Sequence, residues 1–271
     1  MSLPMEIHCE NLHSVLSAMG LLLPAAKQEP LRSAPLGSVI VCVDFHPGDW
    51  NDPRMMQMGV AILDSPPQDA GIISKFKAFE SFRNYHFAIN SSFRYEMADF
   101  RYGYTADCSD LDDILGHLGS VLPQDRPFIV VLRHKDGVDR KVTDFIARQT
   151  FFQGFVNVDP ESPKKFWAMR YHRLKEIFKV AGVYDVMQDI SCAGNTAHNI
   201  LQATLQLAHR AFLNWTPFPD RDETFLLWAL KDVAMRDTRR PILDIEPVQQ
   251  TEQEDDGWAW LTEEVSEEEE Y

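Results

Sequence analysis

The order of apolar and polar residues along the chain predicts strands and helices in alternation. Apolar runs of strand length, with or without period-two alternation, are typical of strands in a buried sheet. Such runs lie at residues 38–44, 57–64, 84–90, 127–132 and 154–158. Apolar residues three or four positions apart predict helices at residues 111–121, 138–148, 163–180, 196–213 and 223–235.

Three strands, a helix, a strand, a helix, a strand and further helices follow one another in this order. Apolar strands that are joined by helices are characteristic of the α/β class. The sequence therefore predicts an α/β domain in which a mixed five-stranded sheet is flanked by helices.

The two ends of the chain differ from this central part. Residues 1–36 contain a short amphipathic helix and a proline-containing connector, and residues 37–240 carry the alternating elements. Residues 241–271 lose periodicity and become acidic, and a segment of this kind cannot bury enough apolar surface to fold by itself. We expect a helical extension, one folded domain and a disordered tail.

The net charge of −15 is concentrated at the C-terminus. Of the 41 acidic residues, ten lie among the last twenty positions, which hold no basic residue, so 31 acidic residues face 26 basic ones in the rest of the chain. This balance is mildly unfavourable for a protein that grips phosphates over its whole surface. Trp258 and Trp260 stand among the acidic residues, and they either dock on a protein partner or pack on the chain's own surface.

Four cysteines lie far apart along the chain and form no CxxC pair: Cys9, Cys42, Cys108 and Cys192. This spacing is typical of reduced thiols in an intracellular protein, not of a disulfide framework or a zinc site. The start of the chain carries acidic residues, and its apolar run stops at Pro24, so we expect no secretory or membrane-spanning segment. The expected location is intracellular, in the nucleus or the cytoplasm.

One segment has a specific motif. It begins Ser191-Cys-Ala-Gly-Asn-Thr196-Ala and continues as a predicted helix. It resembles the third motif of the DEDDh 3′–5′ exonucleases, most closely a fungal branch in which the motif is His-Asn-Ala-Gly-Asn-Asp-Ala followed by a helix. Ser191 stands in the position of the general-base histidine, and Thr196 stands in the position of a metal-binding aspartate.

Two further motifs of that family have counterparts in this chain. At the end of the first predicted strand, Asp44 is kept and His46 stands where the family has glutamate. Asp139 follows five residues after a histidine, as in the second motif of the fungal branch, with Arg133 in place of a glycine. The resemblance covers about residues 38–212 and implies the ribonuclease H-like fold, whose element order matches the predicted one.

The resemblance implies a site of four carboxylates that hold two divalent metal ions, beside a histidine that takes a proton from the attacking water. In this chain Asp44 and Asp139 remain, while His46, Ser191 and Thr196 replace the other acids and the base. A serine hydroxyl is not a base near neutral pH, and imidazole is a poor ligand for Mg²⁺. We predict that these five residues converge at the carboxyl end of the first strand as an inactive remnant site, without a metal ion or another cofactor.

An altered nuclease is the first alternative. Asp44, His46 and Asp139 could together bind one Zn²⁺ or Mn²⁺ ion, with His198 as the base, and a divalent metal such as Mg²⁺ or Mn²⁺ would then be the cofactor. His198 lies within the predicted helix, at a position where the similar family also often has histidine. This placement favours a structural role for the residue.

A nucleic-acid-binding regulator is the second alternative. Basic residues with aromatic neighbours gather around one predicted helix: Lys164, Lys165, Arg170 and Arg173. Such a face could hold a strand through phosphate contacts and base stacking. The same stretch also has the pattern of an ordinary amphipathic helix that turns Leu174, Ile177 and Phe178 inward.

The leading interpretation is a pseudonuclease, a catalytically inactive exonuclease-like scaffold that works by binding. The acidic body and the two tail tryptophans favour a protein partner, and the N-terminal amphipathic segment suggests self-association. Nucleic acid stays an alternative partner, and no membrane association is expected.

Overall fold

The computed structural model describes a set of stretches within one compact unit, residues 1–239. The described stretches are residues 9–21, 37–46, 56–64, 82–89, 100–103, 105–133, 138–158, 167–183, 192–216 and 218–235. For residues 9–11 and 167–173 the description covers the helical backbone and not the side chains. The predicted acidic tail, with Trp258 and Trp260, lies outside the described residues.

A six-stranded mixed sheet forms the centre of this unit. Its strands are β1 (Val39–His46), β2 (Gln57–Leu63), β3 (Arg83–Ile89), β4 (Thr105–Cys108), β5 (Phe128–Leu132) and β6 (Phe152–Asn157). They lie in the order β4-β3-β2-β1-β5-β6, with β2 antiparallel to β1 and β3 and the other neighbouring pairs parallel. The α/β class and the flanked mixed sheet are confirmed, and the arrangement is consistent with a ribonuclease H-like fold that has six strands where five were predicted.

The additional strand is β4, which the sequence pattern did not predict. Its four residues contain no apolar run, and only Cys108 at its end is buried. The strand pairs in parallel with β3 along residues His86 to Ile89. The formation of β4 therefore depends on its pairing with β3 more than on its own amino-acid composition.

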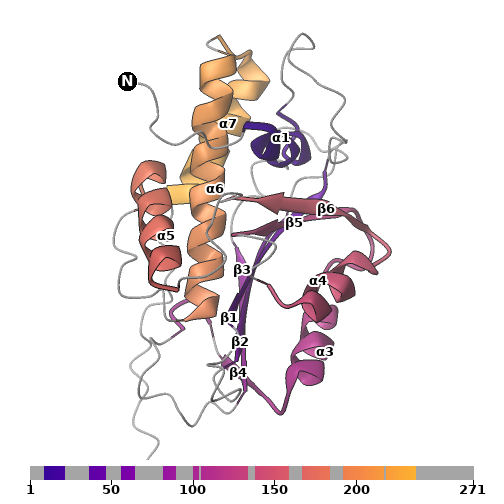
Figure 1. Cartoon of the computed structure of the whole chain (residues 1–271). Helices are drawn as coiled ribbons and strands as arrows, with labels where there is room; N and C mark the ends of the chain where they lie inside the picture. The colour runs from indigo at the N-terminus through magenta and orange to yellow at the C-terminus, as the bar shows by residue number, and fades with distance from the viewer. Residues whose placement is uncertain are drawn as a thin grey trace, which may run out of the picture. The chain divides into compact units, whose positions relative to one another are not determined.

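Helices cover both faces of the sheet (Figure 1). α3 (Leu111–Val121) and α4 (Arg140–Ala147) lie on one face, and α5 (Trp167–Ala181) and α6 (Ala193–Trp215) lie on the other. α1 (Cys9–Ala18) and α7 (Arg221–Met235) pack against α6. The predicted helices agree with these bounds to within a few residues. Among the described helices, none combines the length and the apolar character that a membrane crossing requires.

β1 shows how the two faces of the sheet are specified. Its odd-numbered residues from Val39 to Phe45 belong to the core beneath α3 and α4, whereas Ile40 and Cys42 belong to the core beneath α6. Side chains alternate between the two faces along a strand. Asp44 and His46 therefore continue the series that faces α6, at the carboxyl end of the strand.

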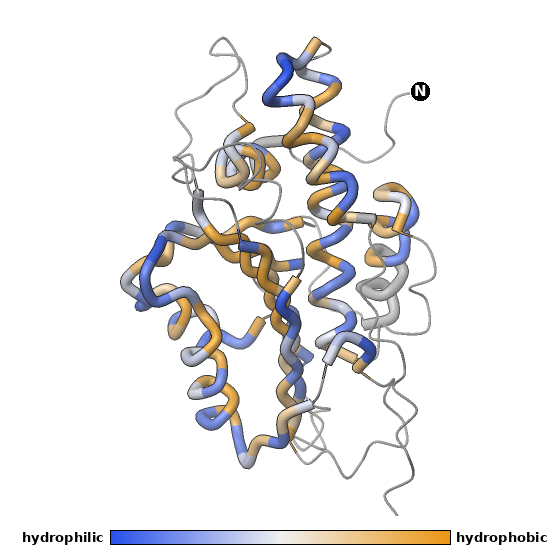
Figure 2. Tube along the Cα trace, turned by 180° about the vertical axis from the view of Figure 1, so that it is seen from behind, coloured by the Kyte–Doolittle hydropathy of each residue, from blue (hydrophilic) through white to orange (hydrophobic). Residues whose placement is uncertain are grey.

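α6 is enclosed over most of its length. Every residue from Ala193 to Ala208 is buried, because the helix contacts β1, β2 and β3 as well as α1, α5 and α7. Hydrophilic and hydrophobic residues both occur along this long helix (Figure 2), so polar side chains are enclosed together with apolar ones. A buried polar group costs free energy unless it is hydrogen-bonded. The partners of these polar side chains define the candidate site.

The N-terminal helix belongs to the same core. Among the described side chains of this helix, Leu12, Val15, Leu16 and Ala18 are buried, and so is Met19, which directly follows it. They pack in one cluster with the apolar side chains of α6. The amphipathic pattern of this helix is thus used within the chain, and these side chains are not free apolar surface for the self-association that the sequence suggested.

Candidate functional site

Asp44 and His46 form the centre of the candidate site, at the carboxyl end of β1. Asp44 Oδ2 lies 2.8 Å from His46 Nε2, and the two side chains are 4% and 8% exposed. The two atoms are at hydrogen-bonding distance, and both are buried. Two buried polar atoms that face each other in this way form either an ion pair or two ligands of one cation.

Basic side chains hold the pKa of Asp44 below its usual value of 3.8. Burial by itself raises this pKa, but the neighbouring His46 and Arg133 outweigh the effect of burial. Arg133 directly follows β5, in which Leu132 pairs with Val43 of β1, so Arg133 lies at the same sheet edge as Asp44. The carboxylate therefore stays charged, and its charge is compensated by the chain's own basic groups.

The start of α6 is seated on the strand beside Asp44. Gly59 pairs with Asp44 in the register of β1 and β2, and a Cβ atom at Gly59 would lie 2.0 Å from the carbonyl oxygen of Ala193. Only glycine permits this approach. The first turn of α6, which includes Thr196, thus lies over β2 close to the site. The Thr196 hydroxyl donates to the Cys192 carbonyl oxygen at 3.0 Å, in the same turn.

Asp139 has a local role at the start of α4. It is the N-cap of this helix, and its Oδ1 accepts the N–H of Lys141 at 2.7 Å. Because β1 and β5 are parallel, the segment after β5 leaves the sheet at the edge where Asp44 lies. Ser191 lies outside the described residues. The structure thus joins Asp44 to His46 and places Thr196 nearby, and the convergence of all five positions stays a prediction.

A second group of buried polar side chains secures the start of α6 to the sheet. Gln57 Oε1 accepts the N–H of Ala193 at 3.2 Å and lies 3.0 Å from His86 Nε2. Because this amide oxygen only accepts, Nε2 carries the proton, and Nδ1 accepts from the Thr105 hydroxyl at 2.8 Å. Burial, together with the nearby His46, lowers the pKa of His86 to about 4. His86 is therefore a neutral hydrogen-bonding residue at neutral pH.

His198 occupies another buried position on α6. Its ring stacks on Tyr102 with centroids 3.7 Å apart, and it meets Phe82 edge-on at 4.9 Å. His198 Nδ1 lies 3.0 Å from Asn84 Oδ1. Burial lowers the pKa of His198 to about 3. These contacts fit the structural role that the sequence favoured for this residue.

Residues 100–103 cover the polar side of α6. The N–H of Arg101 donates to Asn195 Oδ1 at 3.0 Å, and the Tyr102 hydroxyl donates to Asn199 Oδ1 at 3.4 Å. The sequence analysis did not single out either asparagine. Amide side chains within a helix of mainly small and apolar residues are the signal that could have identified them, since such groups are buried only with partners.

The predicted basic face lies mostly beyond what the structure describes. Lys164 and Lys165 lie outside the described residues, and so do the side chains of Arg170 and Arg173 in α5. In the described part of α5, three apolar side chains of the predicted stripe are buried: Leu174, Ile177 and Phe178. This burial agrees with the amphipathic-helix interpretation, while nucleic-acid binding stays a prediction.

Large apolar side chains reach the solvent near the end of α6 and on α7. Among the described residues these are Leu213, Phe218 and Trp228, which are 39%, 92% and 63% exposed. Phe225 meets Trp228 edge-on with centroids 6.2 Å apart, and the Arg221 guanidinium lies over Phe225 at 5.7 Å. Aromatic and arginine side chains are enriched in protein–protein interfaces.

Comparison with known proteins adds no family to this picture. No protein-family model matches the chain, and no functionally curated protein matches it significantly in sequence. The function is therefore inferred from the residues of the site and from the fold that carries them.

Proposed function

We propose that this protein is a pseudonuclease, an exonuclease-like scaffold without catalytic activity that acts by binding a protein partner. The observation that carries this proposal is the environment of Asp44. Its carboxylate lies 2.8 Å from His46 Nε2 and is influenced by Arg133, so its charge is compensated within the chain. The resemblance of residues 191–208 to the third exonuclease motif supports an exonuclease-like origin of the scaffold.

The chemistry of divalent cations supports the same proposal. Two Mg²⁺ ions need several oxygen ligands from separate segments. Here the Thr196 hydroxyl donates within its own helix, and the Asp139 carboxylate caps α4. A guanidinium beside Asp44 also repels any cation that approaches the carboxylate.

We expect the purified chain to leave single-stranded DNA and RNA intact in the presence of Mg²⁺ or Mn²⁺, because too few oxygen ligands remain to hold the metal ions. The measurement is the shortening of 5′-labelled strands on a gel, with Asp44→Ala run in parallel. Metal-dependent 3′–5′ trimming by the native chain that Asp44→Ala lacks would show a catalytic site. Trimming that persists in Asp44→Ala would come from a contaminating enzyme.

The exposed aromatic side chains on and before α7 are our candidate for the partner surface. Trp228 and Phe218 are largely exposed, and truncation of a central aromatic residue commonly costs an interface more than 1 kcal/mol. We expect Trp228→Ala to weaken a complex, reconstituted from the purified chain and a partner captured with it, at least about tenfold. Asp222→Ala, an exposed position on the same helix, is the matched control and should bind normally.

Two results would redirect this assignment. Equal affinity of Trp228→Ala and the native chain would exclude the α7 surface. A chain that ends at residue 250 lacks Trp258 and Trp260, and loss of binding in that chain alone would assign the partner to the tail.

A metal-dependent nuclease with an altered site is the second candidate, and one observation favours it. Asp44 Oδ2 and His46 Nε2 are both buried and face each other at 2.8 Å, a spacing at which two ligands can share one ion. Calorimetric titration with Mn²⁺, which prefers oxygen and nitrogen over thiolate ligands, separates the two proposals. The pseudonuclease predicts no binding heat that depends on Asp44. The altered nuclease predicts one bound ion that is lost in Asp44→Asn and in His46→Gln.

A further inference from the structure

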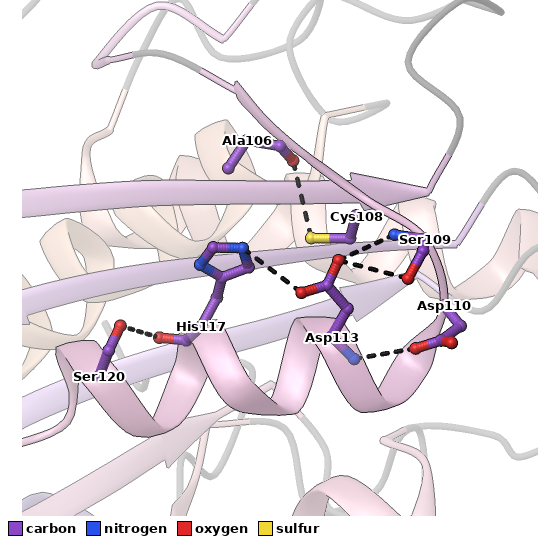
Figure 3. Close-up of polar contacts among 7 residues, drawn as sticks. All are labelled: Ala106, Cys108, Ser109, Asp110, Asp113, His117 and Ser120. Carbon is purple, nitrogen blue, oxygen red and sulfur yellow. Dashed lines mark hydrogen bonds and ion pairs between the residues drawn. The ribbon is translucent and has the colours of Figure 1, made fainter.

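Three side chains of metal-binding type lie together on the opposite face of the sheet from α6. Cys108 is the last residue of β4, and Asp113 and His117 lie one turn apart on α3 (Figure 3). One ligand atom from each of the three lies within 4.8 Å of the other two. The cysteine spacing alone gave no sign of a metal site, because the other two ligands come from a carboxylate and an imidazole.

The start of α3 fixes the position of the Asp113 carboxylate. Asp110 is the N-cap of the helix, and its Oδ1 accepts the N–H of Asp113 at 2.9 Å. Asp113 Oδ2 in turn accepts the N–H of Ser109 at 2.9 Å and its hydroxyl at 3.4 Å. Helix capping therefore accounts for one carboxylate oxygen. The other oxygen, Oδ1, is directed toward His117.

His117 completes the cluster from the next turn of the helix. Residues four positions apart lie on the same helix face, and His117 Nε2 is 3.6 Å from Asp113 Oδ1, which is too long for a hydrogen bond. The ring stacks on Phe87 with an interplanar angle of 12°. The side chains of His117 and Asp113 are 43% and 41% exposed, whereas Cys108 is buried. The cluster is thus anchored on one side and open to solvent on the other.

We propose that Cys108 Sγ, Asp113 Oδ1 and His117 Nε2 bind one Zn²⁺ ion, with water from the exposed side as the fourth ligand. Bonds of about 2.0–2.3 Å in a tetrahedral zinc site place the ligand atoms roughly 3.3–3.8 Å apart. Asp113 Oδ1 and His117 Nε2 already have this spacing at 3.6 Å, and no two of the three donors are more than 4.8 Å apart. Binding releases the thiol proton of Cys108 to the solvent, because thiolate is the form that binds the metal.

The ligand types select the metal. A thiolate and an imidazole suit Zn²⁺, whereas Mg²⁺ and Ca²⁺ need several oxygen ligands and find one carboxylate here. The bound ion joins the end of β4 to α3 and so fixes one edge strand of the sheet to the helix that covers it. This proposal is independent of the activity at Asp44.

Cobalt spectroscopy on the full-length chain provides the test. Co²⁺ replaces Zn²⁺ in such sites, and a cysteine ligand gives a thiolate-to-cobalt charge-transfer band. We expect this band to saturate at one ion per chain and to disappear on addition of Zn²⁺. Zn²⁺ in large excess over its dissociation constant is also expected to raise the melting temperature by about 5 °C.

Substitutions assign the site. Cys108→Ser should abolish the band. His117→Ala should weaken Co²⁺ binding at least about tenfold, because even the loss of a group that only orients a metal ligand costs about tenfold in affinity. Asp112→Asn, an exposed neighbour on α3, is the matched control and should bind normally. The proposal is overturned by the absence of the band in the native chain, by a band that survives Cys108→Ser, or by unchanged affinity in His117→Ala. If Cys108→Ser does not fold, His117→Ala tests the proposal in its place, because the side chain of His117 is half-exposed.

Discussion

Gly59→Ala is expected to lower the free energy of unfolding by about 3 kcal/mol or more. The added Cβ would lie 2.0 Å from the carbonyl oxygen of Ala193, 2.3 Å from its carbonyl carbon and 2.5 Å from the backbone nitrogen of Gly194. These are backbone atoms, so no side-chain rotation can relieve the overlap, and the start of α6 must move away from β2. Thermal unfolding followed by circular dichroism should show a loss of roughly 6–12 °C for a domain of this size.

Gly116→Ala is the matched control for this substitution. Gly116 lies on the exposed side of α3, and a Cβ there meets no atom within 4 Å. Alanine favours the helix, so we expect a gain of up to about 1 kcal/mol. If Gly59→Ala melts at the temperature of the native chain, the close contact between β2 and α6 is absent in solution, and the placement of Thr196 near Asp44 is wrong.

Acid is expected to destabilise the chain well before its carboxylates are protonated. His86 and His198 have pKa values of about 4 and about 3, against an ordinary value of 6.5. As the pH falls below 6.5, the unfolded chain binds protons at both histidines and the folded chain does not. The two buried neutral histidines therefore contribute fully to the stability of the folded chain above pH 6.5, and this contribution is lost as the pH falls toward 4. We expect the free energy of unfolding to fall by about 3 kcal/mol between pH 7 and pH 5. The measurement is urea unfolding in a chelating buffer.

Substitution of one histidine isolates its share of this pH dependence. His198→Asn keeps a donor for Asn84 Oδ1 but removes the titrating ring, so we expect about half of the pH slope to disappear. The stability at pH 7 also falls because the contacts with Tyr102 and Phe82 are lost, and the slope, not the level, is the readout. An unchanged slope in His198→Asn would mean that the native ring already takes up the proton.

These two predictions concern the same feature, the polar layer between α6 and the sheet. Gln57 and His86 hold the first turn of α6, and Asn195 and Asn199 hold residues 100–103. A scaffold that acts by binding needs a fixed surface and no reactive groups. The proposed pseudonuclease is consistent with such a layer, because these polar side chains are hydrogen-bonded to one another and to the backbone.

Most secondary-structure elements could be predicted from the sequence. The apolar run that became β1 and the period of α6 are strong signals, because a strand buried on both faces and an enclosed helix both need many apolar residues. β4 gave no such signal, because this strand forms by pairing with β3 and not from an apolar pattern of its own. In the candidate site, Asp44 and His46 could be predicted to be neighbours, because residues two apart on a strand share a face. For Arg133, the sequence indicated only that this residue replaces the glycine of a family motif.

The amino-acid sequence by itself determined the α/β class, most helix and strand positions and the absence of acids at positions 46 and 196. Tertiary structure decided which groups meet. The register of β1 with β5 brings Arg133 to the edge where Asp44 lies, and the register with β2 places Gly59 beneath the start of α6. Packing also used the N-terminal amphipathic helix inside the core and gathered Cys108, Asp113 and His117 from a strand and a helix. Such contacts join residues far apart in the chain, and no local pattern of apolar and polar positions specifies their partners.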